Sequence, residues 1–318
     1  LLALLKQNGY NTSFYYGGDS RFDNMEAYLN NNSIDSIYDE RTFPSGFEKM
    51  PSQNGFTWGY GDKELFRYFL ATPKKQTQPQ LSVVLTVSTH NPFLINEQKR
   101  YYTKLETRMA ELGFSEKTKS QNRRYRDQYA SILYADDALK DFINQYKQRP
   151  GFNNTVFVIT GDHRMPEIPM STKIDRYHVP LLIYSPLLQR RARFSAISTH
   201  FDITPSLAAW LKESYGLQMP DTVSWIGSGL DTTRRFRNVH AYPIMQTKTE
   251  IIDFVMGNYL LNGNNLFRIN TNMDLSPENN EAKVNELKAA FNRFKQKNQF
   301  FISTLKMVPD SLLRKYTI

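Results

Sequence analysis

Two short segments place side chains that suit metal or phosphate chemistry directly after an apolar run. Asp162 and His163 follow the run 155–160 after one glycine, and His90 follows the run 81–87. A carboxylate and an imidazole both bind divalent metal ions, and the glycine gives the backbone freedom to turn both toward one ion. His90 can donate to a phosphoryl oxygen or protonate a leaving group. An Asp that caps a helix and a hydrogen-bonded turn His are the structural alternatives.

The elements that position these residues alternate between strands and helices. Three nearly continuous apolar runs are typical of parallel strands buried on both faces. These runs are 81–87, 155–160 and 179–184. Apolar residues at helical spacing over 129–146 and a helix start at Thr204 complete an α/β fold with a doubly wound, mostly parallel sheet. Ligands bind beyond the carboxyl ends of such strands, where His90, Asp162 and His163 would emerge.

The sequence changes character after residue 237. Short strand-like runs alternate there with Gly-Asn and Asn-Gly turns, which indicates an antiparallel meander, and an amphipathic helix is expected over 279–305. We therefore predict one domain over 1–237 and a small C-terminal α+β subdomain, an antiparallel sheet plus a helix, over 238–318.

Composition narrows the classes of function. With 318 residues, 40% of them hydrophobic and 22% charged, the chain is globular rather than disordered. The absence of cysteine excludes thiol catalysis, Cys-ligated zinc and iron–sulfur clusters. A net charge of +9 favours an anionic partner. Scattered basic clusters without a nucleic-acid motif predict that this partner is not nucleic acid. These clusters are 123–126, 190–193 and 234–237.

The first residues indicate that the chain continues upstream. Leu1–Lys6 has the pattern of a helix without an N-cap, and the chain does not begin with Met. No run of 18 or more apolar residues is present, so no segment is expected to span a bilayer. We expect the chain to be the larger part of a longer protein.

Five motifs follow one another in a familiar order. They are Gly-Gly-Asp-Ser-Arg-Phe-Asp-Asn-Met (17–25), Gly-Asp-Lys-Glu-Leu-Phe (61–66), Thr-His-Asn-Pro-Phe (89–93), Gly-Asp-His (161–163) and Phe-Asp-Ile-Thr-Pro-Ser-Leu (201–207). In this order they resemble the lipoteichoic acid synthase-like phosphotransferases, which are membrane-anchored members of the alkaline phosphatase/sulfatase superfamily. The resemblance covers most of residues 1–235.

The resemblance implies one divalent metal ion, Mn²⁺ or Mg²⁺, bound by Asp162 and His163. An upstream Glu and a nucleophilic Thr would complete the site, and both would precede residue 1, as would the membrane helices. His90 matches the family's substrate His, with a role in phosphate binding or leaving-group protonation. Arg21 and Asn24 lie in a loop that the family uses against glycerol phosphate. The chain alone is expected to be inactive.

The implied function is that of a metal-dependent phosphotransferase or phosphodiesterase at the outer face of a bacterial membrane. Its substrate would be a phospholipid or a glycan that bears glycerophosphate, and its catalytic domain would lie on the periplasmic or extracellular side. Asp23 and Met25 flank Asn24 where Gram-positive synthases have an aromatic residue and an Arg, so the loop is more similar to Gram-negative relatives. A sulfatase, which usually has Asp-Asn after the strand, and a non-catalytic module that binds anionic ligands are the alternatives.

Overall fold

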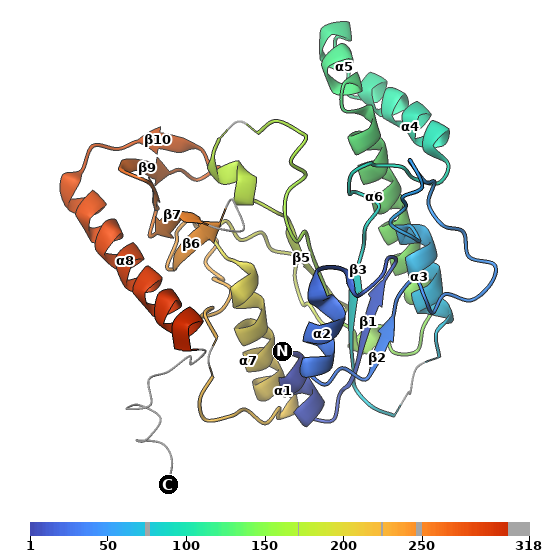
Figure 1. Ribbon diagram of the computed structural model, residues 1–318, viewed down its shortest axis with the longest axis horizontal. Helices are drawn as coiled ribbons and strands as arrows, with labels where there is room; N and C mark the ends of the chain where they lie inside the picture. The colour runs from blue at the N-terminus through green and yellow to red at the C-terminus, as the bar shows by residue number, and fades with distance from the viewer. Residues whose placement is uncertain (74–76, 171, 224, 246–249, 305–318) are drawn as a thin grey trace. The chain divides into compact units, whose positions relative to one another are not determined.

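The chain forms two compact units in the computed structural model, whose described residues are 1–318 except 74–76, 171, 224, 246–249 and 305–318 (Figure 1). Unit 1 comprises residues 1–169 and 180–189, and unit 2 comprises residues 170–179 and 190–318. The domain division predicted after residue 237 follows a different boundary and stays a prediction.

Unit 1 holds the first six α-helices and the first five strands. Its helices are α1 Leu2–Gln7, α2 Met25–Asn31, α3 Asp62–Ala71, α4 Gln98–Glu111, α5 Glu116–Arg123 and α6 Arg126–Tyr146, with the 3-10 helices η1 Phe22–Asn24 and η2 Phe152–Asn154. Its strands are β1 Asn11–Tyr16, β2 Ser36–Tyr38, β3 Gln80–Leu85, β4 Phe157–Thr160 and β5 Leu181–Tyr184.

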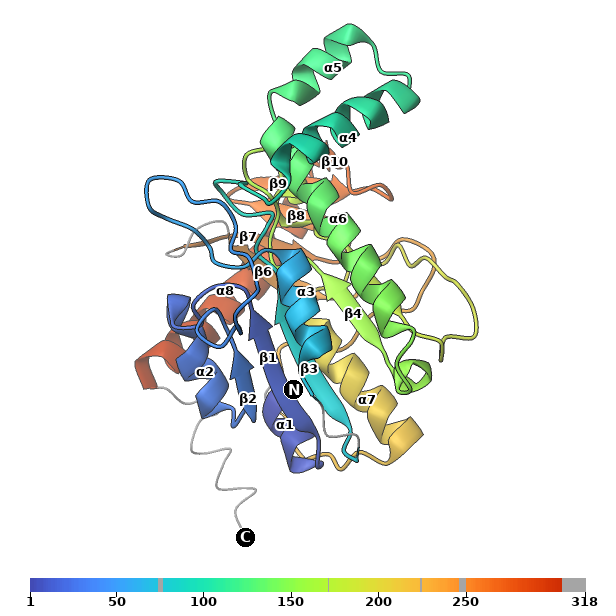
Figure 2. The ribbon, with the colours of Figure 1, turned by 90° about the vertical axis from the view of Figure 1, so that its right-hand side faces the viewer.

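The core of unit 1 is a parallel sheet in the order β2-β1-β3, covered by helices on both faces. Phe14 of β1 lies opposite Val83 of β3, so the predicted strand 81–87 forms within one or two residues of its expected bounds. On one face Tyr15 packs with side chains of α3 and α6, which lie side by side in Figure 2. On the other face Phe14 packs with Leu29 of α2. This is the predicted doubly wound arrangement.

Strands β4 and β5 differ from the prediction in direction and in burial. They pair antiparallel, with Phe157 opposite Tyr184. Every β5 side chain is 37–57% exposed, so the expectation that this apolar run is buried on both faces is wrong. The described residues between the two strands contain only the 3-10 helix η3 Ile174–Tyr177. Without a crossover helix, the chain returns beside β4 in the opposite direction.

Unit 2 combines helices with a five-stranded sheet. Its strands are β6 Ala241–Met245, β7 Ile251–Met256, β8 Tyr259–Asn262, β9 Asn265–Ile269 and β10 Leu275–Pro277. Its helices are η3, η4 His200–Asp202, α7 Ile203–Tyr215 and α8 Glu281–Thr304.

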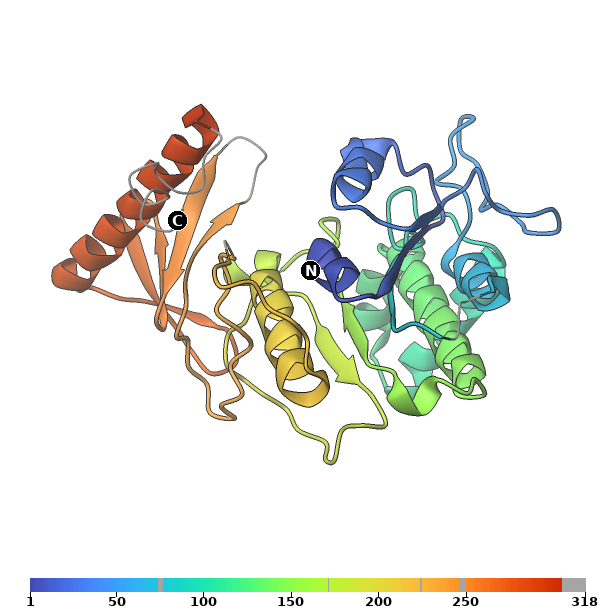
Figure 3. The same cartoon turned by 90° about the horizontal axis from the view of Figure 1, so that it is seen from below.

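The unit 2 sheet is the predicted antiparallel meander, in the order β10-β9-β8-β7-β6, with β10 as a strand that the sequence patterns did not indicate. Helix α8 packs on one face, where Phe291 stacks on Phe254 of β7 with ring centroids 5.0 Å apart (Figure 3). The predicted helix 279–305 therefore forms, although residue 305 lies outside the described residues. Helix α7 begins one residue before the expected Thr204. None of the helices in the described ranges is both long and apolar enough to cross a bilayer.

Candidate functional site

Asp162 and His163 begin the loop after β4, and their side chains face one another. Asp162 Oδ1 accepts a hydrogen bond from the backbone N–H of His163 at 2.8 Å. His163 Nδ1 lies 2.7 Å from the carbonyl oxygen of Arg164. Because a carbonyl only accepts, Nδ1 carries the proton and Nε2 of the neutral ring keeps its lone pair. This Nε2 lies 3.6 Å from Asp162 Oδ2.

The donor set of this pair fits part of a divalent-metal site. Two ligands about 2.1 Å from one ion are roughly 3.0 Å apart at an octahedral angle and 3.4 Å apart at a tetrahedral angle, both shorter than the 3.6 Å observed here. The side chains of Asp162 and His163 are 70% and 61% exposed, so a cation from solvent can reach them. Across the residues that the structure describes, no group of three or more His, Asp or Glu side chains is arranged to bind a metal. The pair alone is too small a set for a metal site, and its assignment as metal ligands stays a prediction.

Negative charge gathers where β1 ends. Burial, and then the charges of Glu40, Asp19 and Asp162, raise the pKa of the Tyr16 hydroxyl to about 12. Asp162 is thus within electrostatic reach of the β1 end, although it follows β4. Glu40 and Asp19 each have a Lys or Arg partner, whereas Asp162 pairs within the described residues only with His163. Asp162 is therefore the carboxylate of these three that has no Lys or Arg partner within the described residues.

Arg21 and Asn24 lie in the loop that follows β1. Asp23 and Asn24 have φ angles of 53° and 62°, in the left-handed region that residues other than glycine rarely adopt. The Arg21 Nε donates to both oxygens of Asp19 at 2.9 and 3.0 Å, and these hydrogen bonds hold the pKa of Asp19 well below its usual range. Arg21 remains 67% exposed, so its remaining N–H groups can reach a ligand.

A buried network beneath this loop holds it in place. Ser20 is fully buried, and its hydroxyl donates to Asp39 Oδ2 at 2.7 Å. Arg41 donates to the same Asp39 oxygen at 2.6 Å and to Glu26 at 2.9 Å. Burial alone would raise the pKa of Asp39, but the hydrogen bonds from Arg41 and Ser20 outweigh it and lower that pKa. The charged Asp39 thus anchors the segment that presents Arg21 and Asn24.

His90 lies in the turn after β3, and the ring of Trp58 packs between it and the loop 21–24. Its Nδ1 donates to the carbonyl oxygen of Asn91 at 3.0 Å, and the Trp58 indole N–H donates to the same oxygen at 2.7 Å. The Trp58 ring lies 4.5 Å from the His90 ring and 5.4 Å from the ring of Phe22. Phe22 follows Arg21, so Trp58 links His90 to the loop 21–24. His90 and Trp58 also line a pocket of about 10 Å³, room for about one water.

The structure thus forms two groups from the predicted residues. One is Asp162 with His163, and the other is His90 with the loop 21–24. Within the described residues no hydrogen bond or ion pair joins His90 to Asp162 or His163. Their assignment to one catalytic site stays a prediction.

Asp62 is a positioning residue that the sequence patterns did not identify. It is fully buried, and its Oδ1 accepts hydrogen bonds from Val87 N–H, Ser88 N–H and the Ser88 hydroxyl at 3.0, 3.0 and 2.8 Å. These contacts fix Val87 and Ser88, which follow β3 and lead into the turn that holds His90. The motif around Asp62 was recognised, but nothing local to it indicates a partner 26 residues away.

Gly17 permits close backbone packing at the start of the 21–24 loop. The Tyr60 N–H donates to Gly17 O at 2.8 Å, and a Cβ on Gly17 would lie 2.0 Å from Tyr60 O. We expect Gly17→Ala to destabilise the chain by about 3 kcal/mol, because the two backbones must separate. Urea unfolding measures this loss. Gly151→Ala is the matched control, since its Cβ meets nothing within 4 Å. Equal unfolding midpoints for the two variants would contradict the prediction.

Comparisons with known proteins agree with this architecture. The family model described as Sulfatase matches residues 1–213. The lipoteichoic acid synthase-like protein YvgJ of Bacillus subtilis is 26% identical over 159 residues, which cover 50% of this chain and 23% of that protein. The lipoteichoic acid synthase of Staphylococcus aureus strain USA300 is 27% identical over 165 residues, 51% of this chain and 23% of the relative. The chain thus spans about a quarter of the length of these relatives.

A solved structure confirms the fold class. The lipoteichoic acid synthase LtaP from Listeria monocytogenes superimposes with a TM-score of 0.68 at 19% sequence identity, covering 95% of this chain and 72% of that one. The α/β core with a C-terminal α+β part is therefore shared with an alkaline phosphatase/sulfatase-type enzyme. The family model covers about two thirds of the sequence, and the relatives are enzymes of the lipoteichoic acid synthase type. The chain belongs to the sulfatase family.

Proposed function

We propose that this chain forms the larger part of the catalytic domain of a metal-dependent phosphotransferase or phosphodiesterase. Its substrates would be glycerophospho-type lipid headgroups or glycerophosphate-bearing glycans at the outer face of a bacterial membrane. The protein would be anchored by helices upstream of residue 1, with the catalytic domain on the periplasmic or extracellular side. The relatives named lipoteichoic acid synthases support this proposal, as does the basic net charge.

The pairing of Asp162 with His163 is the observation that carries the proposal. The two residues would bind one divalent ion, Mn²⁺ or Mg²⁺, through Oδ2 and Nε2, together with ligands from a segment outside this chain. The ion supplies positive charge that offsets the developing charge on a phosphoryl group. A Thr nucleophile is proposed to come from the same upstream segment.

The remaining residues bind and orient the substrate. The Arg21 guanidinium and the Asn24 amide would contact the glycerophosphate group. Their exposure on the loop whose Phe22 packs against Trp58, the neighbour of His90, supports this role. His90 donates Nδ1–H to Asn91, so its Nε2 is the atom left to face the substrate. In the imidazolium form Nε2 also carries a proton, which it would donate to a phosphoryl oxygen or to the leaving group.

The proposal is tested by metal titration and by a comparison of two ester classes. Calorimetry of the full-length protein with Mn²⁺ or Mg²⁺ should show one site, and this protein should cleave a p-nitrophenyl phosphodiester only with metal present. Preference for p-nitrophenyl sulfate would instead assign a sulfatase, which the family's name makes the second candidate. Binding of phosphodiester without turnover by the full-length protein would indicate a non-catalytic module.

His90→Ala is expected to lower turnover of a glycerophospholipid by about 100-fold, the usual contribution of a positioned acid or base. Metal affinity should not change, because His90 contacts neither Asp162 nor His163 in the described residues. The substitution should affect a p-nitrophenyl ester less if His90 protonates the leaving group, since nitrophenolate needs no proton. An unchanged kcat with a raised KM would assign phosphate binding, and wild-type kinetics would remove His90 from the mechanism.

A further inference from the structure

The helical arm of unit 1, defined as residues 98–126, carries much of the excess positive charge of the chain. It contains nine Lys or Arg residues against three Glu residues, whereas the whole chain has an excess of nine. The arm comprises α4, α5 and the first residue of α6, and Figures 1 and 2 show it extending away from the strands of unit 1. Such a concentration of charge attracts anions over roughly 10 Å at 0.1 M salt.

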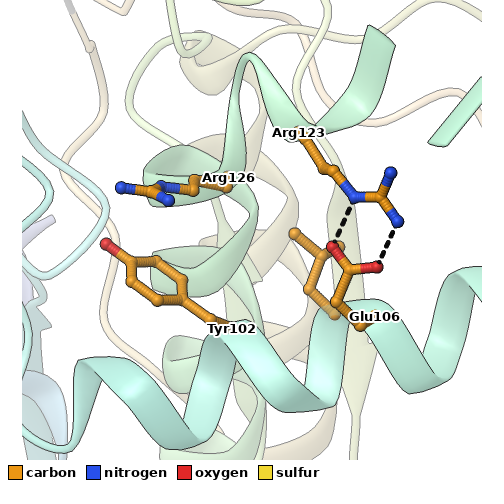
Figure 4. A pocket seen from close by; sticks show the side chains of 5 residues that line it. Tyr102, Glu106, Arg123 and Arg126 are labelled. Carbon is orange, nitrogen blue, oxygen red and sulfur yellow. Dashed lines mark hydrogen bonds and ion pairs between the residues drawn. The ribbon is translucent and has the colours of Figure 1, made fainter. Parts of the chain in front are cut away.

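Helix α5 of this arm adds nothing to the core of unit 1. None of its side chains is buried, and it is held on α4 by Arg123, whose Nε and Nη2 donate to Glu106 at 2.8 Å each (Figure 4). A helix that is polar on all sides is not maintained by core packing. Lys99, Lys117 and Arg124 are exposed and form no ion pair within the described residues. Their charges are available to a partner.

The tip of the arm exposes a leucine among polar and charged side chains. Leu112, at the end of α4, is 50% exposed, and Phe114 is half-buried two residues later. Gly113 between them has a φ of 66°, which turns the chain sharply toward α5. Arg108 and Lys117 flank this turn in sequence and are both exposed. An exposed leucine among basic side chains is the pattern of a protein segment that enters a membrane interface.

A pocket between α4 and the start of α6 offers room for an anionic group. Its volume is about 210 Å³, and it is lined by Tyr102, Leu105, Arg126 and the ion pair of Arg123 with Glu106, in which the carboxylate charge is already compensated. Figure 4 shows the Arg126 guanidinium lying over the Tyr102 ring, 4.8 Å from its centroid. Arg126 has a carboxylate neighbour, Asp127, only at 3.6 Å, so its N–H groups can also donate to a phosphate. The pocket is smaller than sites that enclose drug-sized ligands, roughly 300–1,000 Å³, and suits a single headgroup.

We propose that the helical arm binds the surface of an anionic phospholipid bilayer. Leu112 and Phe114 enter the interface, while Lys117 and Arg124 contact lipid phosphates and Arg126 receives a headgroup. A bilayer explains the exposed Leu112, whose burial in the interface is favourable, whereas a soluble polyanion would leave it in water. The proposal is independent of the proposed catalytic function, because binding is measured without turnover and without metal.

Co-sedimentation with vesicles tests the proposal. The chain should bind vesicles of phosphatidylcholine with 30 mol% phosphatidylglycerol more tightly than pure phosphatidylcholine, and added salt should weaken that binding. The double variant Lys117→Ala/Arg124→Ala should bind about 30-fold more weakly, at about fivefold per basic side chain near the surface. Leu112→Ser should weaken vesicle binding about tenfold. It should leave the binding of soluble polyphosphate unchanged. Neither change should alter the urea midpoint, since all three side chains are exposed.

Arg190→Ala/Arg191→Ala is the matched control, because it removes the same charge from exposed residues of unit 2. Its vesicle affinity should stay within twofold of wild type. An equal loss in the control would show that only net charge matters, and would overturn the proposal. Wild-type binding to polyphosphate but not to vesicles would also overturn it and would assign a soluble polyanion instead.

Discussion

Asp162→Ala is expected to abolish metal binding and to lower phosphodiester turnover of the full-length protein by about 1,000-fold. Asp162 has no Lys or Arg partner within the described residues, and its Oδ2 faces the lone pair of His163 Nε2. Without the Asp162 carboxylate, only one of the two proposed ligands, His163, would remain. A bound cation contributes several kcal/mol of transition-state stabilisation, and about 4 kcal/mol corresponds to a factor of 1,000 in rate. Calorimetry with Mn²⁺ and a turnover assay measure the two effects.

Two further variants separate metal loss from other causes. His163→Ala should reproduce the loss of metal affinity, because each residue supplies one donor atom. Asp141→Ala removes an exposed carboxylate of unit 1 that forms no ion pair within the described residues, and it should change neither affinity nor turnover. Wild-type Mn²⁺ affinity in Asp162→Ala would place the metal site elsewhere.

The sequence predicted the fold correctly where nearby residues alone determine an element. The helix over 281–304 and strands β6 to β9 of the C-terminal meander formed as expected, because apolar spacing and Asn-Gly turns specify them without distant contacts. The direction of β5 was not predictable, since an apolar run specifies burial preference and not the direction of pairing. Helix α5 was missed because it has no apolar stripe, so no spacing of apolar residues marks it in the sequence.

In the candidate site, too, contacts between neighbours in sequence were predictable and contacts between distant residues were not. Asp162 and His163 are adjacent in sequence and follow a strand, so their meeting was predictable. The tautomer of His163 depends on a backbone carbonyl, and Trp58 reaches His90 across 32 residues of sequence. Neither contact has a local signal. Asp62 is the strongest such case, because its role depends entirely on partners in another element.

Asp62→Ala is expected to destabilise the chain by roughly 3–5 kcal/mol. The substitution removes the Oδ1 that accepts from Val87 N–H, Ser88 N–H and the Ser88 hydroxyl, and it leaves these buried donors without that acceptor. Each buried donor left unsatisfied costs about 1–3 kcal/mol. The free energy of unfolding of a typical domain is only about 5–15 kcal/mol, so we expect this variant to be partly unfolded at 37 °C. Urea unfolding followed by circular dichroism measures the loss.

A conservative variant tests whether Asp62 acts through His90. Asp62→Asn keeps an acceptor at Oδ1, so its free energy of unfolding should fall by less than about 2 kcal/mol. Its turnover should stay near wild type, whereas Asp62→Ala, assayed at a temperature where it is folded, should resemble His90→Ala in turnover and keep full metal affinity. Wild-type turnover in folded Asp62→Ala would show that Asp62 stabilises the fold without positioning His90.

The stability of the chain should depend on pH through Asp62, and the burial of this carboxyl determines the sign of the effect. Burial raises the pKa of Asp62, and the hydrogen bonds from Ser88 and Val87 offset only part of that rise. A carboxyl whose pKa is raised on folding contributes stability that is fully present below its unfolded value, about 3.9, and that is lost as pH rises through the folded pKa. Asparagine does not titrate, so the free energy of unfolding of Asp62→Asn should increase relative to wild type as pH rises above about 4. Parallel stability curves for the two proteins between pH 4 and 8 would mean that Asp62 has no raised pKa, because every other titrating group is common to both.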